Sequence, residues 1–211
     1  MTTNAVANQA NAASLPTTTY AQFAGMCAIL AGIAGFLYAV AFILLRNPLL
    51  SAVFLLLTGF LSTAALVAVY RRLRTTDADF ALWALLLGLV GALGATIHGG
   101  YDLANTINPP AAAAAALPSA IDPRGLLTFG ISGIALFVVA WLMGRGRQFP
   151  MGLRYLGYLS AALLIILYLG RLVILDPANP IILAPALLNG FLVNPTWYIW
   201  LGLVLWHKRA M

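Results

Sequence analysis

The sequence predicts an all-α polytopic membrane protein, a bundle of six transmembrane helices with both termini in the cytoplasm. Apolar residues make up 63% of the 211 residues and charged residues only 8%, whereas a soluble domain carries about 25% charged residues. Six apolar segments each reach the roughly 20 residues that cross a bilayer. Lipid offers the backbone no hydrogen-bond partners, so we expect every segment to cross as a helix.

The six predicted spans form one domain over residues 20–206. They cover 21–45, 48–70, 79–101, 125–143, 151–175 and 187–206. The first two are joined by "RNP", a tight turn in which Pro48 starts the second helix. Residues 1–19 are polar and lack the basic region of a secretory signal, so we expect a disordered cytoplasmic tail. Residues 207–211 form a basic cytoplasmic tail.

Two connections are unusual. The third, 102–124, contains six consecutive alanines, which form at most a marginal isolated helix. The fifth, "DPANPIILAPALLNG", is apolar with three prolines, and we expect a loop that dips back toward the bilayer. Each connection is a candidate cover for a cavity, and each could equally be a plain connector.

The basic residues predict the orientation. One side of the membrane receives Arg71, Arg72, Arg74, Arg145, Arg147, Arg154, Lys208 and Arg209, and the other only Arg46, Arg124 and Arg171. The richer side belongs in the cytoplasm. Trp83, Trp141 and Trp206 fall near the same ends, as an interfacial aromatic belt requires. We therefore interpret the net charge of +6 as a topology signal and expect no nucleic-acid partner.

Small residues predict where helices pack closely. They recur in the first span at Ala24, Ala28, Ala31, Gly32 and Gly35, and in the third at Gly88, Gly91, Ala92, Gly94 and Ala95. Such stripes allow close helix contact in lipid, within one chain, in a homo-oligomer or with another membrane protein. In the sixth span Pro195 predicts a kink, with Asn194 and Thr196 available to satisfy the freed backbone groups.

A polar stretch ends the third span. "ATIHGGYDLANTINPP", residues 95–110, places His98 and Asp102 four residues apart, on one helix face if the helix continues; Gly99 and Gly100 favour unwinding there. At 1.5 Å per residue, His98 lies about 28 Å above Asp79. Arg171 reaches a similar depth, where it either snorkels to the headgroups or pairs with Asp102 or Asp176.

These depths predict an outward-facing polar pocket. Its candidate residues are His98, Tyr101, Asp102, Tyr168, Arg171, Asn189 and Asn194. We assign none of them a catalytic role. One buried histidine cannot supply a bis-histidine haem site or, with no glutamate in the chain, a usual zinc site. We therefore predict no metal and no cofactor.

Four segments carry a resemblance to a known family. "AGMCAILAGIAGFLYAVAF", "ALVAVYRRLRTTDADFALWALLLGLVGA", "RGRQFPMGLRYLGYLSAALLIILYLG" and "APALLNGFLVNPTWYIWLGLVLW" resemble the DUF4386 family of bacterial membrane proteins over about residues 20–206. The resemblance implies a six-helix bundle in the bacterial inner membrane and supplies no activity. The long alanine connection departs from the family pattern.

Three functions follow as hypotheses. The first is a non-enzymatic protein that binds membrane lipid or another hydrophobic ligand, or serves as an accessory subunit of a membrane complex. The second is a small-solute transporter or channel, which Pro195 and the outward polar residues would suit. The third, an enzyme at the outer interface using His98 and Asp102, is the weakest, because the pair lacks a third partner.

Overall fold

The computed structural model describes residues 19–109, 119 and 121–207, and every regular element in them is helical. The all-α prediction is therefore confirmed. The expected N-terminal tail up to residue 18, the alanine run and the last four residues lie outside the described residues.

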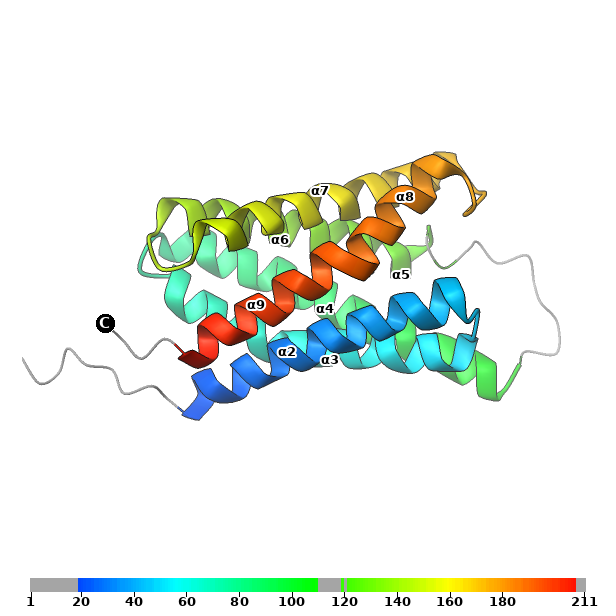
Figure 1. Ribbon diagram of the computed structural model, residues 1–211, viewed down its shortest axis with the longest axis horizontal. Helices are drawn as coiled ribbons and strands as arrows, with labels where there is room; N and C mark the ends of the chain where they lie inside the picture. The colour runs from blue at the N-terminus through cyan, green and yellow to red at the C-terminus, as the bar shows by residue number, and fades with distance from the viewer. Residues whose placement is uncertain (1–18, 110–118, 120, 208–211) are drawn as a thin grey trace, which may run out of the picture.

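The helical elements join into six rods, which run side by side (Figure 1). In chain order they are α2 (Thr19–Ala39) with the π-helical η1 (Val40–Leu44); α3 (Pro48–Leu73); α4 (Ala78–Ile107); α5 (Pro123–Gly125) with π-helical η2 (Leu126–Ile131) and α6 (Ser132–Arg145); α7 (Met151–Val173); and α8 (Pro180–Leu188) with π-helical η3 (Asn189–Val193) and α9 (Asn194–His207).

Five of these rods are long and apolar enough to cross a membrane: Tyr20–Leu44, Pro48–Leu73, Ala78–Ile107, Pro123–Arg145 and Met151–Val173. The chain is therefore a multi-pass helical membrane protein. The sixth rod, 180–207, contains Asn189 and Asn194 and is not among the five, so its crossing stays a prediction. The start of α2 and the end of α9 lie at one end of the bundle, here called the terminal end; the opposite one is the distal end (Figure 1).

Capping side chains explain where two helices begin. Asn47 precedes Pro48, and its Oδ1 accepts a hydrogen bond from the Leu50 N–H at 3.0 Å. Asp77 caps α4 in the same way, with its Oδ1 3.2 Å from the Phe80 nitrogen. Each cap satisfies a backbone donor that has no partner inside the first turn. The predicted starts at residues 48 and 79 agree with these positions to within one residue.

The helix does not unwind at Gly99 and Gly100, the alternative that these two glycines left open, and α4 continues to Ile107. Gly99 is a contact point between helices: a Cβ there would lie 2.5 Å from the Leu56 nitrogen and 2.6 Å from the Ala52 carbonyl oxygen. The missing side chain lets α4 rest on the backbone of α3, and this packing outweighs the low helix propensity of glycine.

The fifth connection is also different from expectation, since most of it is helix α8. Asn179 and Pro180 form a helix start, and the Asn179 Oδ1 accepts from the Ile181 N–H at 3.0 Å. Pro185 lies within the helix. The sixth rod therefore begins at residue 180, seven residues before the predicted 187.

The terminal half of the bundle is solidly packed. Its largest fully buried side chains are Val69, Leu73, Leu142, Leu153, Trp197, Leu201 and Leu205. The small residues of the first span pack inside the chain: Ala24, Ala28 and Ala31 are fully buried, and a Cβ on Gly25 would lie 2.9 Å from the Gly202 carbonyl oxygen of α9. This seam joins the first and last helices of one chain.

Candidate functional site: a cavity in the distal half of the bundle

A cavity of about 730 Å³ opens among the helices, with wall residues from all six rods. This volume lies within the roughly 300–1,000 Å³ typical of small-molecule sites. Along α3 the wall runs from Ser51 to Leu66, a rise of about 22 Å at 1.5 Å per residue. The cavity is therefore elongated along the bundle. At the distal end it reaches the exposed Arg46, Pro177 and Ala178.

Much of the cavity wall is apolar in effect, because its hydroxyl groups are already used. Each of four hydroxyl groups donates to a nearby backbone carbonyl oxygen: Ser51 to Pro48 (3.0 Å), Thr58 to Phe54 (2.8 Å), Ser62 to Gly59 (2.8 Å) and Ser132 to Leu127 (3.4 Å). The Trp197 indole N–H donates to the Leu153 carbonyl at 3.1 Å. A bound molecule therefore meets few unsatisfied donors along these walls.

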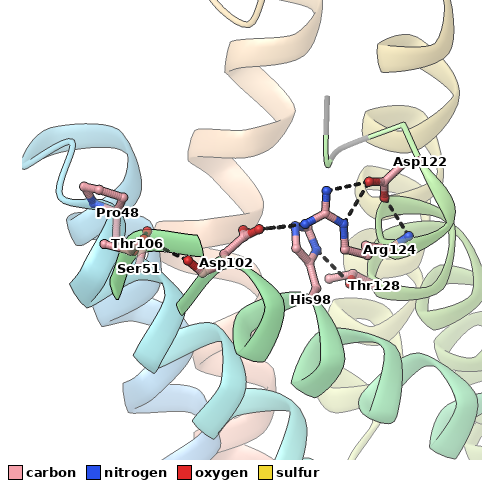
Figure 2. A network of polar contacts seen from close by, with 8 residues as sticks. All are labelled: Pro48, Ser51, His98, Asp102, Thr106, Asp122, Arg124 and Thr128. Atoms are coloured by element: carbon pink, nitrogen blue, oxygen red, sulfur yellow. Dashed lines mark hydrogen bonds and ion pairs between the residues drawn. The ribbon is translucent and has the colours of Figure 1, made fainter. Parts of the chain in front are cut away.

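Figure 2 shows a network of charged and polar side chains, of which His98, Asp102 and Thr128 line the cavity. The Asp102 carboxylate lies 3.4 Å from His98 Nε2 and 2.8 Å from Arg124 Nη1. The other ring nitrogen of His98, Nδ1, lies 3.2 Å from the Thr128 hydroxyl. Arg124 also contacts Asp122, with its Nη2 2.6 Å from Oδ2. The network ties α4 to α5 and η2.

The Asp122–Arg124 pair is held by local structure. Asp122 caps α5, accepting from the Arg124 N–H at 2.7 Å, and Pro123 takes the first helical position. Burial alone would raise the pKa of the Asp122 carboxyl, but the hydrogen bonds and positive charge of Arg124 outweigh it, so the pKa lies below its usual value. Arg124 also lies over the Tyr101 ring, 4.2 Å from its centroid.

Arg171 is buried, with 8% of its surface exposed, and lines the cavity. Its Nη1 donates to the carbonyl oxygens of Ile174, at 3.3 Å, and Leu175. Pairing with Asp102 or Asp176, one of the two predicted alternatives for Arg171, is not formed in the described part of the chain. Asp102 is already paired with Arg124, whereas the carbonyls beyond the end of α7 need donors.

An amide cluster lies deeper in the cavity. The fully buried Ser160 hydroxyl donates to Asn189 Oδ1 at 2.8 Å, and the Asn194 amide lies 3.5 Å from Ser160 Oγ. The Asn194 side chain therefore contacts α7. The sequence predicts only that it satisfies the backbone groups freed by Pro195. The helix before Pro195 opens into the π-helical η3, which ends at Val193, as expected where a proline removes a donor and crowds the preceding turn.

All three π-helical segments contribute to the cavity wall. Phe42 and Ile43 come from η1, Thr128 and Phe129 from η2, and Asn189 and Gly190 from η3. Single π turns inside α-helices occur frequently at functional sites, because the extra residue redirects side chains. The three π-helical segments therefore meet at this cavity, which makes it the candidate functional site.

The structure brings five of the seven candidate residues to the cavity: His98, Asp102, Arg171, Asn189 and Asn194. Tyr101 is 53% exposed and packs on Arg124 instead. Tyr168 packs its ring toward Gly130 in η2, where a Cβ would lie 3.1 Å from Cδ1.

Sequence reasoning missed Arg124, Asp122, Thr128 and Ser160. "DPR" at 122–124 holds an N-cap aspartate followed by a proline, a recognisable helix start. It therefore signalled the position of Arg124. Nothing local marked Thr128 as a partner of His98, which lies thirty residues earlier.

No family model, curated protein or solved structure matches this chain. The DUF4386 resemblance and the bacterial inner membrane therefore stay predictions. Among residues 19–109, 119 and 121–207, no three His, Cys, Asp or Glu side chains gather as a metal site would require.

Proposed function

We propose that this membrane protein binds an amphipathic ligand in the distal cavity and acts without chemical turnover. The observation that carries the proposal is the elongated cavity of about 730 Å³, whose walls are mainly apolar and whose distal end is charged. A molecule with a hydrocarbon part and a polar end matches both regions. Such a protein could work alone or deliver its ligand as a subunit of a larger complex.

The closed terminal half favours binding over conduction. Leu73, Leu142, Leu153, Leu201 and Leu205 fill that half with under 2% exposure, so a path across the bundle would require repacking of the core. Transport is the second candidate, favoured by the three π-helical segments around the cavity. It predicts ligand flux into sealed vesicles, which a binding protein would not support.

Thr128 gives the enzyme hypothesis the third partner that it lacked, because its hydroxyl contacts His98. The contacts of His98, Asp102 and Thr128 are better suited to holding helices together than to catalysis. The Asp102 carboxylate lies closer to Arg124, at 2.8 Å, than to His98, at 3.4 Å, so the carboxylate is committed to an ion pair between α4 and α5. We therefore assign the network to shaping the cavity entrance.

A cavity-filling variant tests the proposal. Ala186 in α8 lines the cavity, whereas Ala184 on the same helix is exposed and does not. We expect Ala186→Phe to displace co-purifying amphiphile and lower its occupancy at least about tenfold, since the ring occupies the ligand's volume. The readout is native mass spectrometry after extraction in a mild neutral detergent.

Ala184→Phe is the matched control and should retain the bound species of the unmodified protein. Equal occupancy in Ala186→Phe and Ala184→Phe, or a protein that carries no amphiphile and takes none up, would refute ligand binding in this cavity.

A further inference from the structure

Resting on the proposed function, we infer that the ligand is a single-chain amphiphile with an anionic head, a carboxylate or a phosphate, and that Arg171 binds the head. The hydrocarbon chain would then extend along α3 and α4 toward the packed terminal half. Two features of the cavity favour such a ligand: the charge of its wall and its length.

Arg171 is the first piece of evidence. A guanidinium has five N–H donors, and the described contacts of Arg171 use only Nη1, toward two backbone carbonyls. Arg171 is only 8% exposed and lines the cavity. It has no carboxylate partner among the described residues. Charges inside membrane proteins usually pair with an opposite charge, so an anion in the cavity would supply the missing one.

The other charges at the distal end do not compete for that role. Asp102 lines the cavity, but Arg124 and His98 hold its carboxylate. Asp176 is exposed and accepts from the Ala178 N–H at 2.9 Å. Arg46 lies on the cavity wall at the exposed turn before α3 and adds a second positive charge at the entrance. The cavity therefore favours a negative ligand head.

The length and volume of the cavity favour a ligand with a single hydrocarbon chain. The wall residues of α4 run from Gly88 to Asp102, about 21 Å of helix. A hydrocarbon core of roughly 30 Å contains two leaflets, so one acyl chain takes about 15 Å of it. One chain and its head thus fit the length, whereas a two-chain phospholipid exceeds the volume usual for small-molecule sites.

The experiment compares three ligands that share one hydrocarbon chain and differ in the head group. Tritium-labelled hexadecanoate, hexadecyl phosphate and hexadecanol are each titrated against the full-length protein, freed of lipid in neutral detergent, by scintillation proximity. We expect both anions to bind at least about tenfold more tightly than the alcohol, because hydrogen bonds to a charged partner are the strong ones. The tighter anion identifies the source as a fatty acid or a phosphate-headed lipid.

Variants at Arg171 complete the test. Arg171→Gln should abolish the preference for anions, and Arg171→Lys should preserve most of it. Arg147→Gln, at an exposed position of the terminal end, should leave it unchanged. If Arg171→Gln does not fold, titration of the three ligands against the unmodified protein and against Arg171→Lys still tests the preference for an anionic head.

Equal affinity for the alcohol and the anions would overturn the anionic head. A preference for anions that survives in Arg171→Gln would overturn the binding of the head by Arg171. Either result would leave ligand binding in the cavity intact. Failure of all three probes, with Ala186→Phe and Ala184→Phe indistinguishable, would instead refute the proposed function.

Discussion

Competition among side chains decides the pairing at the distal end. Asp102 can meet His98 on its own helix, and Arg124 reaches it from α5 at 2.8 Å. A guanidinium keeps its charge at all ordinary pH values and offers a rigid set of donors, which suits it to hold two carboxylates. Arg171, for which pairing with Asp102 was one of the predicted alternatives, has no carboxylate partner among the described residues and lines the cavity.

This pairing predicts unequal costs for two arginine substitutions. Arg124→Gln removes the guanidinium that Asp102 and Asp122 share, and their side chains are only 37% and 15% exposed. We expect a loss of about 1–3 kcal/mol, between the values for exposed and buried pairs. This lowers the thermal unfolding midpoint in detergent by a few degrees, at roughly 2–4 °C per kcal/mol.

Arg145→Gln is the control at the terminal end. The Arg145 side chain is 50% exposed and lies 3.5 Å from Asp77, so its loss should cost under about 1 kcal/mol. Equal midpoints for the two variants would show that the distal network does not stabilise the fold.

Among the helices, close contact between α3 and α4 sets the shape of the cavity wall. Gly59 and Gly99 lie where the two backbones meet: a Cβ on Gly59 would come within 2.5 Å of the Ala92 carbonyl oxygen. Such small residues substitute for the hydrophobic force that lipid removes between helices. The same contact keeps α4 helical through two glycines and brings His98 and Asp102 onto one face.

Neighbouring glycines in α4 supply a matched test. Gly99→Ala would push a methyl group against backbone atoms of Ala52 and Leu56, which cannot move cheaply, and should cost about 1–3 kcal/mol. At Gly100 the nearest atom, Leu56 Cδ1, is 3.8 Å away. Gly100→Ala should therefore keep or raise stability, by up to about 1 kcal/mol from helix propensity. Thermal midpoints that fall equally in both variants would contradict this assignment of the α3–α4 contact.

For the whole molecule, the arrangement of the rods has a consequence for topology. The described ends of α2 and α9 lie at the same end of the bundle (Figure 1), as the six predicted crossings require. The positive-inside rule predicts that this end faces the cytoplasm. Under that prediction the cavity opens toward the outer side of the membrane.

Cysteine labelling in intact cells tests the direction. The native Cys27 is buried, so Cys27→Ala provides a background for single cysteines. Ala178→Cys at the distal end should react with a membrane-impermeant maleimide, and Arg147→Cys at the terminal end should react only after permeabilisation, because both native positions are exposed. The reverse pattern would invert the predicted orientation and turn the cavity inward.

The helical class and the approximate limits of the spans could be predicted from the sequence, because they depend on local quantities. Apolar length, cap residues and the spacing of basic clusters act over a few neighbouring residues, and lipid penalises every exposed backbone group in the same way. Five of the seven residues predicted for the pocket also reach the cavity, because depth along a helix follows directly from residue number.

Tertiary contacts decided the remaining features. Whether Asp102 meets Arg124 or Arg171, whether two glycines unwind α4 or pack it on α3, and whether Thr128 touches His98 all depend on segments distant in sequence that compete for the same space. Helix periodicity specifies which face a side chain occupies, but only the packing of all six rods determines what that face meets. The cavity itself is a product of that packing, since no single helix contains it.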